Sequence, residues 1–492
     1  MTNYTKKAVR GTIMLMINSS LASVFSYLLR LLLARTLSIE EFGLYYAVFT
    51  FLSFFMFFRS FGLDSALVKY IAEFEVKKEY NKIKTAIASA LLFQLVSSII
   101  FIGILFFLSN FLAATYFKNP MASSLMKILI LYVPFSMLYL FLMDILQGFQ
   151  RIKVLSFVNP VLKFLFLLLT FIFFKLNYNI FSPALALVIG SGLMFLLLIP
   201  FASKSFNFFK YKITNFKFIT KKLFLFGLPV VMVTFGGIII SYVDTLLLIY
   251  FRTMTEVGIY NVALPTATIF LFLAGGLSTV LFPMASELWA RKEKQKLSDG
   301  ITLLYKYSFL LLIPFMLSVF SFAKLFIRIL FGQEFVSGAL SLQILLIGTL
   351  FYIVATINNT IISGIGKPKV VTKTILFAAG ANFVLNLILI PFFGIEGAAF
   401  ATTLSYLFVL IVSTIKLKQF IKLQSPWKSW CYTFICGAIF VGVINILKRV
   451  LVMNEWLELI LAVTISVSVY ILLIFVFKLV DLKEIKKYAK LI

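Results

Sequence analysis

The stretch "SYLLRLLLARTLSIEEFGLYYAV", from Ser26 to Val48, returns later in the chain as "SYVDTLLLIYFRTMTEVGIYNVA", from Ser241 to Ala263. Ser, Tyr, three Leu, Glu, Gly and Tyr recur in register at an offset of about 215 residues. Each copy begins with a hydrophobic run that carries one ionisable residue within it, Arg30 in the first and Asp244 in the second. A chain that repeats such a unit is expected to consist of two similar halves.

The repeat extends beyond this stretch. "GLDSALVKYIAE" from Gly62 is answered by "GLSTVLFPMASE" from Gly276, and "GFQRIKV" from Gly148 is answered by "GIGKPKV" from Gly364. A chance match between leucine-rich helices is the alternative, but the shared Tyr, Gly, Glu and Lys lie at loop positions. Each half covers six apolar runs, and an even number of spans gives both halves the same orientation.

The composition indicates a membrane protein. The chain of 492 residues is 62% hydrophobic and 13% charged, with 59 Phe and no His. Long continuous apolar runs favour helices over the short alternating segments of a β-barrel. The formal charge of +27 would also suit a nucleic-acid partner. The basic residues, however, gather in alternate loops, as expected for the cytoplasmic loops of a membrane protein. This distribution argues against nucleic acid. Cys431 and Cys436 lack the spacing of a metal or redox motif.

Apolar runs and charged breaks predict an all-α polytopic protein with about 14 transmembrane helices. The expected spans are 12–35, 43–65, 84–109, 122–147, 154–175, 181–203, 223–251, 257–284, 300–323, 338–363, 370–393, 396–416, 429–447 and 456–478. They form two parallel six-helix lobes related by a pseudo-twofold axis along the membrane normal, plus a C-terminal pair. The expected domains are an N-lobe (1–205), a cytoplasmic linker (206–222), a C-lobe (223–427) and a C-terminal pair with a basic tail (428–492). The basic loops place both termini in the cytoplasm.

Three basic residues within the predicted spans of the first half are candidates for a binding site: Arg30, Arg59 and Lys163. An ionisable group in a span is costly unless it faces a polar cavity or has a partner. One interpretation is a pocket for phosphate or pyrophosphate, because Arg offers paired donors. The other is snorkelling or ion pairing, for example of Arg59 with Asp64 or Asp144.

A second set of polar residues lies near the outer ends of later spans. Asp244, Asn386 and Thr402 fall at a similar depth of about 10 Å, and Asn382 lies one helical turn from Asn386 on the same face. A carboxylate, amides and a hydroxyl at one level form an oxygen cage suited to a small cation. Hydrogen bonding that only locks the helices together is the alternative.

The quoted motifs also carry a resemblance to a known family. "RLLLARTLSIEEFGLYYAVFTF" followed by "GLDSALVKYIAEF", and "GIGKPKVVTKTILFAAGANFVLNLILIPFFGIEGAAFATTLSY", resemble the polysaccharide-biosynthesis (Wzx-type) flippases of lipid-linked oligosaccharides. These belong to the multidrug/oligosaccharidyl-lipid/polysaccharide exporter superfamily. The resemblance implies a sodium site similar to that of the lipid II flippase branch, completed by the backbone carbonyl of Ala398. Asn386 departs from that pattern, since an acid stands there in that branch.

The resemblance implies a transporter and not an enzyme. A flippase would move a polyprenyl-(pyro)phosphate-linked oligosaccharide to the outer leaflet by alternating access, in the plasma membrane, with Na⁺ as a coupling ion and no other cofactor. Its partners would be the lipid-linked glycan, membrane lipids and a glycan polymerase or glycosyltransferases. A MATE-like exporter of drugs or metabolites is the first alternative, which Arg30, Arg59 and the extra helix pair disfavour. A membrane glycan polymerase or ligase is the second, and it lacks a visible nucleophile–base set.

Overall fold

In a computed structural model, the described residues are 3–423, 426–450 and 454–480, and every regular element in them is helical. By their contacts, the residues fall into two compact units. The first unit runs to Val262 and includes Ala379–Ala398, and the second contains the rest. Because α8 and part of α9 join the first unit, these units do not coincide with the lobes expected from the repeat. The expected lobe boundaries therefore stay a prediction.

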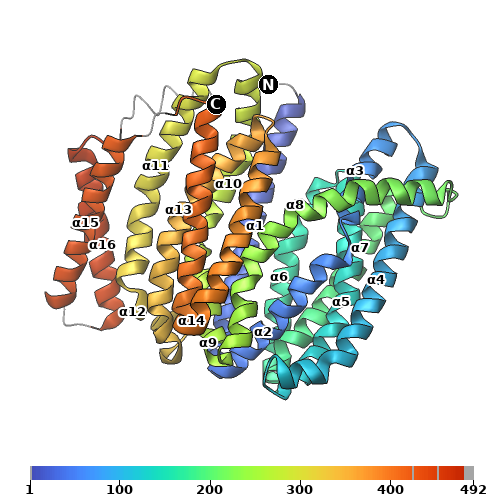
Figure 1. The fold of residues 1–492 in the computed structure, drawn as a ribbon, viewed down its shortest axis with the longest axis horizontal. Coiled ribbons are helices and arrows are strands. Elements are labelled where there is room, and N and C mark those ends of the chain that lie inside the picture. The colour runs from blue at the N-terminus through green and yellow to red at the C-terminus, as the bar shows by residue number, and fades with distance from the viewer. Residues whose placement is uncertain (1–2, 424–425, 451–453, 481–492) are drawn as a thin grey trace. The chain divides into compact units, whose positions relative to one another are not determined.

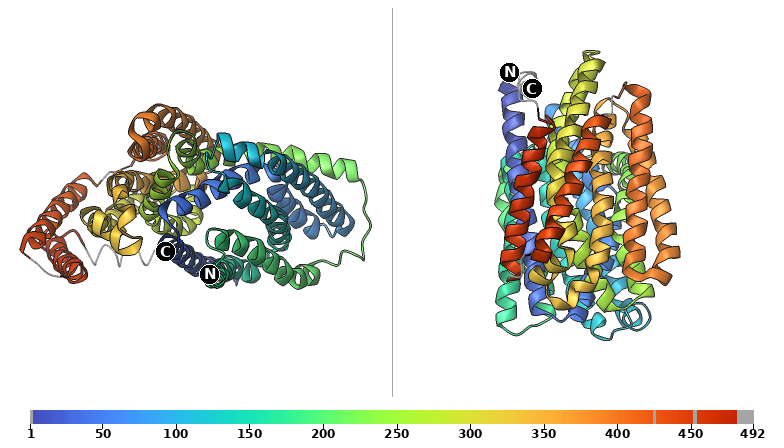
Figure 2. Two further views of the ribbon diagram at one scale, coloured as in Figure 1. Left: turned by 90° about the horizontal axis from the view of Figure 1, so that it is seen from below. Right: turned by 90° about the vertical axis from the view of Figure 1, so that its left-hand side faces the viewer.

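Within each unit, long helices run side by side (Figures 1 and 2). The first unit holds α1 (Asn3–Thr36), α2 (Ile39–Met56), the 3₁₀ turn η1 (Phe57–Arg59), α3 (Leu63–Val76), α4 (Tyr80–Thr115), α5 (Met121–Gly148), α6 (Ile152–Lys175), α7 (Phe181–Ser205), α8 (Phe216–Phe251) and the first part of α9 (Met254–Thr268). The second unit holds α10 (Leu271–Ala290), α11 (Lys294–Ser321), α12 (Ala323–Leu330), η2 (Gln333–Gly338), α13 (Ala339–Gly364), most of α14 (Pro368–Phe420), α15 (Trp427–Val450) and α16 (Glu455–Val476).

Of the helices in the described ranges, 13 are long and apolar enough to cross a membrane. One of them, α14, has 53 residues and is two helices joined at Gly394, where φ is 55° and ψ is −129°. Its length is too great for a single crossing, since about 20 residues span a bilayer. Counted as two crossings, α14 brings the total to the fourteen spans expected from the sequence.

Two of the expected spans are broken, which corrects the sequence-based boundaries. The span expected at 43–65 ends as α2 at Met56 and continues through η1 to a turn at Gly62, where φ is 77°. This conformation suits glycine, and a Cβ on Gly62 would lie 2.2 Å from the carbonyl oxygen of Gly227 on α8. The span expected at 257–284 breaks between the end of α9 at Thr268 and the start of α10 at Leu271.

The repeated stretch forms the same local structure twice in the first unit. Ser38 and Glu41 form a capping box at the start of α2. The hydroxyl of Thr253, in the place that corresponds to Ser38, accepts a hydrogen bond from the backbone N–H of Glu256 at the start of α9, with a distance of 3.3 Å. The recurring Ser/Thr and Glu therefore mark two equivalent helix starts.

The glycines that recur in the repeat meet each other. A Cβ on Gly43 of α2 would lie 1.8 Å from the carbonyl oxygen of Met254 and 2.9 Å from the backbone nitrogen of Gly258. A Cβ on Gly258 of α9 would in turn lie 2.7 Å from the carbonyl oxygen of Ile39. Equivalent residues that contact each other lie at a two-fold axis, so α2 and α9 cross where the repeat predicts its symmetry axis.

This crossing gives a stability prediction. Gly43→Ala is expected to lower the free energy of unfolding by about 3 kcal/mol, because the added Cβ overlaps backbone atoms that cannot move independently. The matched control is Gly103→Ala in α4, where nothing lies within 4 Å of the new Cβ and where alanine gains up to about 1 kcal/mol of helix propensity. Thermal unfolding of both purified variants measures the difference. Equal stabilities would show that the two helices do not need this close approach.

The segment expected as a linker, residues 206–222, docks on the first unit. Phe206 and Tyr211 stack at 5.2 Å, and Tyr211 stacks on Tyr80 at 5.1 Å. The backbone N–H of Thr214 donates to the hydroxyl of Thr85 at 2.8 Å. Further along, Lys222 reaches Glu73 of α3, whose pKa is lowered by a hydrogen bond from Lys77 and by the charge of Lys222. The first part of α8 consequently crosses the ends of its neighbours before the helix turns to run beside them (Figure 1).

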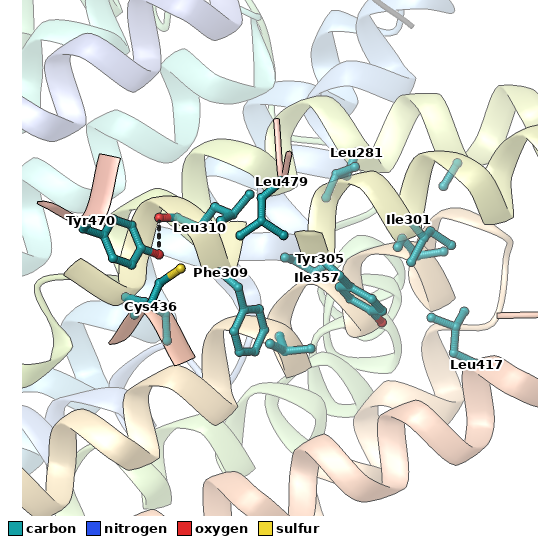
Figure 3. Packing of buried hydrophobic residues seen from close by; sticks show 14 of the residues in the cluster. Leu281, Ile301, Tyr305, Phe309, Leu310, Ile357, Leu417, Cys436, Tyr470 and Leu479 are labelled. Carbon is teal, nitrogen blue, oxygen red and sulfur yellow. Dashed lines mark hydrogen bonds between the residues drawn. The ribbon is translucent and has the colours of Figure 1, made fainter. Parts of the chain in front are cut away.

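The second unit has one large apolar core, to which the C-terminal pair contributes. Cys436, Phe440 and Ala462 of α15 and α16 are buried against α11. Tyr470 of α16 donates a hydrogen bond to the carbonyl oxygen of Leu310 at 3.1 Å (Figure 3). In an uninterrupted α-helix this carbonyl would accept from the residue four positions later, but that residue is Pro314, which has no N–H. A side chain from a neighbouring helix thus satisfies a carbonyl that a proline has freed.

Candidate functional site

The first unit contains seven of the eight residues expected to form binding sites. They are Arg30 on α1, Arg59 on η1, Lys163 on α6, Asp244 on α8, and Asn382, Asn386 and Ala398 on α14. Thr402 belongs to the second unit, where it is buried. The first unit by itself therefore brings the basic residues and most of the oxygen cage into one body.

Arg30 is held by a backbone group and an aromatic ring. Its Nη1 donates to the carbonyl oxygen of Asn261 on α9, and its Cζ lies 4.5 Å from the ring centroid of Tyr46 on α2. The carbonyl of Asn261 is free because the residue four positions later is Pro265. Arg30 is therefore neither fully exposed to lipid nor paired with a carboxylate among the described contacts.

Arg59 lies at the break between α2 and α3. The hydroxyl of Ser97 on α4 donates to its carbonyl oxygen at 2.7 Å, which supports the broken backbone. Its Nε and Nη1 are buried and have no hydrogen-bond partner in the described part of the chain. Asp144 and Asp64 act on its charge through space, but neither forms an ion pair with it there. The pairing that the sequence left as an alternative is thus incomplete.

Two polar residues near this break were not predicted from the sequence. Gln94 is fully buried, Ser98 lies one turn further along α4, and neither side chain has a hydrogen-bond partner among the described residues. Both flank Ser97, which contacts the backbone of Arg59. A buried amide and a buried hydroxyl without partners, on the segment of α4 that contacts the backbone of Arg59, are polar groups available to a ligand. The sequence signal that could have identified them is a glutamine inside an apolar run.

Lys163 lies on α6, which packs along α1. Its Nζ lies 5.5 Å from the ring centroid of Phe166, and the charge of Arg30 acts on it. Two half-buried cations on facing helices repel each other, so an anion between them would be favoured. Lys163 and Arg30 therefore lie on two helices that pack against each other.

Asp244 is the centre of a buried hydrogen-bond node. The hydroxyl of Tyr260 donates to its Oδ2 at 2.6 Å, and Nδ2 of Asn386 donates to its Oδ1 at 2.6 Å. Asp244 is 1% exposed, and Tyr260 and Asn386 are 0% exposed. Hydrogen bonds to an ionised acceptor are stronger than neutral ones. The contact between Asp244 and Asn386 agrees with the equal depths inferred from the sequence, whereas Tyr260 was not predicted.

The node also has unused oxygen atoms. Asn382 is fully buried one turn from Asn386, and its Oδ1 and Nδ2 have no hydrogen-bond partner among the described residues, nor does Oδ1 of Asn386. Ala398 is buried in the same unit. Carboxylate and amide oxygens are the ligands that hard cations prefer. The donor set therefore fits a small cation.

A second contact joins the same two helices nearer their ends. A Cβ on Gly394 would lie 2.7 Å from Oε2 of Glu256 and 2.8 Å from Nη2 of Arg252. Arg252 and Glu256 form an ion pair with a distance of 3.4 Å. Gly394 follows Asn386 by the same interval at which Arg252 follows Asp244. The last part of α8 and the Ala379–Ala398 part of α14 therefore run in parallel, with contacts at two levels.

Comparisons with known proteins agree with this architecture. Residues 8–289 match the family model described as polysaccharide biosynthesis protein, and residues 229–388 match the MatE model. The chain belongs to the polysaccharide biosynthesis protein family. This family of flippases lies within the multidrug/oligosaccharidyl-lipid/polysaccharide exporter superfamily, as the sequence motifs predicted.

Relatives of known sequence include a membrane protein and a flippase. The uncharacterized membrane protein MJ1068 of Methanocaldococcus jannaschii is 30% identical, with 98% of each chain covered. The probable low-salt glycan biosynthesis flippase Agl15 of Haloferax volcanii is 27% identical over 51% of this chain and 53% of its own. The protein is thus a multi-pass member of a transporter family.

Solved structures show the same fold. The lipid II flippase MurJ in an inward closed conformation has a TM-score of 0.77 at 20% identity, with 94% of this chain and 98% of that chain covered. An inward-facing multidrug MATE transporter has a TM-score of 0.67 at 14% identity, with 82% and 97% covered. The two-lobe transporter fold expected from the repeat is confirmed.

Proposed function

We propose that this protein moves a lipid-linked oligosaccharide across the membrane by binding its phosphate or pyrophosphate at Arg30, Arg59 and Lys163. The observation that carries the proposal is the half-buried Arg59, of which Nε and Nη1 are buried and lack hydrogen-bond partners in the described chain. A buried donor without a partner is costly, and a phosphate oxygen would satisfy it. A relative named as a glycan biosynthesis flippase supports a glycan attached to this phosphate.

The basic residues suit the head group and not the lipid tail. Arg30 and Lys163 lie on packed helices, and Arg59 lies at a helix break with Gln94 and Ser98 close by. Amide and hydroxyl groups of this kind hydrogen-bond sugars, while guanidinium groups bind phosphate. The polyprenyl chain would stay in the bilayer, where it loses no hydrophobic contact. Alternating access of two lobes would then carry the head group to the outer leaflet.

We also propose that Na⁺ binds at Asp244, Asn382 and Asn386, with the Ala398 carbonyl as a further ligand. When bound, the ion would supply a positive charge at the buried carboxylate. Tyr260 and Asn386 hold that carboxylate in one orientation, and the unused Oδ1 atoms of Asn382 and Asn386 are available to the ion. A single carboxylate gives this site a lower negative charge than two would.

The proposal includes an orientation. Both termini would lie in the cytoplasm, because basic residues gather in the loops on that side. The transporter would lie in the plasma membrane and receive its substrate from glycosyltransferases, and it would pass the product to a glycan polymerase or ligase outside.

A leaflet-accessibility assay tests this function. Proteoliposomes would contain the purified chain and a fluorescent polyprenyl-phosphate-linked sugar, and a membrane-impermeant quencher or lectin would report the outer-leaflet fraction. We expect the protein to speed equilibration between leaflets at least tenfold over protein-free liposomes. No acceleration for any phosphate-linked sugar, together with efflux of lipophilic cations, would instead favour the drug exporter.

A further inference from the structure

Two adjacent residues of α9 contact two different sites of the first unit. The side chain of Tyr260 donates to Oδ2 of Asp244 at 2.6 Å. The carbonyl oxygen of the next residue, Asn261, accepts from Nη1 of Arg30. Tyr260, which holds the carboxylate of Asp244, is therefore the direct chain neighbour of Asn261, whose carbonyl holds the guanidinium of Arg30.

The second contact exists because of a proline. The carbonyl of Asn261 would normally accept from residue 265, which is Pro265 and has no N–H. Tyr470 takes the carbonyl freed by Pro314 in the same way. There the partner is a neutral hydroxyl in an apolar core, whereas Arg30 is a cation with further donors free for a ligand.

The side chain of Asn261 takes no part in the contact with Arg30. Its Nδ2 donates to the carbonyl oxygen of Val257 at 2.9 Å, along its own helix. Tyr260 is 0% exposed, and the close approach of Gly43 to Gly258 fixes the helix two residues earlier. The position of the α9 backbone after Gly258 is thus determined by the packing of Gly258 against Gly43 and by the polar contacts of Tyr260 and Asn261.

We propose that Tyr260 is a positioning residue that couples the charge state of Asp244 to the availability of Arg30. The proposal deepens the proposed function and rests on Arg30 as part of the anion pocket. When the charge of Asp244 is neutralised by a cation, its bond to Tyr260 weakens. This part of α9 then shifts, and Arg30 leaves the Asn261 carbonyl and can bind a phosphate. A cation at Asp244 and an anion at Arg30 consequently favour each other, and such coupling is reciprocal.

Chemical labelling of Arg30 tests this coupling without a substrate. The full chain in detergent would react with phenylglyoxal, and mass spectrometry of peptides would give the rate at Arg30, with the exposed Arg151 as an internal reference. Asp244→Ala and Tyr260→Phe are each expected to raise the Arg30 rate about fivefold, the low end of typical coupling between sites. The double variant should show no further increase, because both changes break the same connection.

The matched control is Tyr470→Phe. It removes a buried tyrosine hydroxyl that also belongs to a proline-containing contact, but in the second unit. Its Arg30 rate should stay within twofold of the wild-type rate. If Tyr260→Phe does not give a monodisperse protein, Pro265→Ala serves instead: the restored N–H competes for the Asn261 carbonyl, so it should raise the Arg30 rate as well.

Additive rates in the double variant, or wild-type rates in Tyr260→Phe and Pro265→Ala, would overturn the coupling. The proposed function is judged separately by binding of farnesyl pyrophosphate to the same proteins. If the wild type does not bind farnesyl pyrophosphate but the Arg30 labelling rates change together as expected, the anion pocket is rejected and the connection through α9 stands. If binding requires Arg30 but is unchanged in Tyr260→Phe and Asp244→Ala, the anion pocket stands and the connection through α9 is rejected.

Discussion

Arg59→Ala is expected to reduce transport of a polyprenyl-phosphate-linked sugar about 100-fold. Removing one partner of a buried charged contact costs about 2–5 kcal/mol, and each 1.4 kcal/mol corresponds to a factor of about ten. A 100-fold loss corresponds to about 2.8 kcal/mol, which lies within this range. The Nε and Nη1 of Arg59 have no partner in the described chain to compete with the substrate. The rate of leaflet equilibration in proteoliposomes with equal protein content measures it.

Two further variants separate charge from geometry. Arg59→Lys keeps the charge but loses the planar fork that matches phosphate, so we expect a loss of about tenfold. Arg151→Ala is the matched control: this arginine is exposed and its Nε donates to the hydroxyl of Ser205 at 3.1 Å, so transport should stay within twofold. An Arg59→Ala protein that transports within threefold of the wild-type rate would remove Arg59 from the substrate pocket.

Much of the fold follows from the sequence because lipid imposes simple rules. A span must be apolar and about 20 residues long, so the fourteen crossings are visible as runs between charged breaks. The repeat was visible for a further reason. Glu41 and Gly43 recur, and Thr253 takes the place of Ser38, because each position performs the same local task twice, as a helix cap or at a close helix crossing.

The broken helices could not be predicted in the same way. The break at Arg59 depends on the contact between Gly62 and Gly227, which are far apart in the chain. Apolar periodicity does not distinguish a continuous helix from one interrupted by such a contact, because both segments remain apolar. The sequence therefore predicts Arg59 within a regular span, whereas it lies in the 3₁₀ turn η1.

The site was predicted in part for a related reason. Counting residues from the span ends placed Asp244 and Asn386 at one depth, and they form a hydrogen bond at 2.6 Å. Depth does not give the direction in which a neighbouring side chain points, so Tyr260 was missed. The Asn261 carbonyl was missed because backbone groups are the same at every position, and only Pro265 indicated that this one was free.

Asp244→Ala is expected to lower the free energy of unfolding by about 3 kcal/mol and to remove any effect of Na⁺. The substitution leaves the Tyr260 hydroxyl and the Asn386 amide buried without their acceptor. Hydrogen bonds to charged groups contribute about 1.5–3 kcal/mol each, and an unsatisfied buried donor adds a further cost. Thermal unfolding in Na⁺ and in K⁺ at equal ionic strength measures both effects.

A comparison of Asn382 with Asn386 then decides between the two interpretations of this node. If the node only locks helices together, Asn386→Ala should destabilise the protein, Asn382→Ala should change little, and Na⁺ should stabilise neither the wild type nor the variants. A cation site predicts a different pattern, because an ion that binds only the folded state raises its stability by RT ln(1 + [Na⁺]/Kd). Asn382→Ala removes an amide that has no partner among the described residues, so its stability in K⁺ should stay within about 1 kcal/mol of the wild type. Its stabilisation by Na⁺ should nevertheless disappear, since the lost oxygen is a ligand and not a support of the fold.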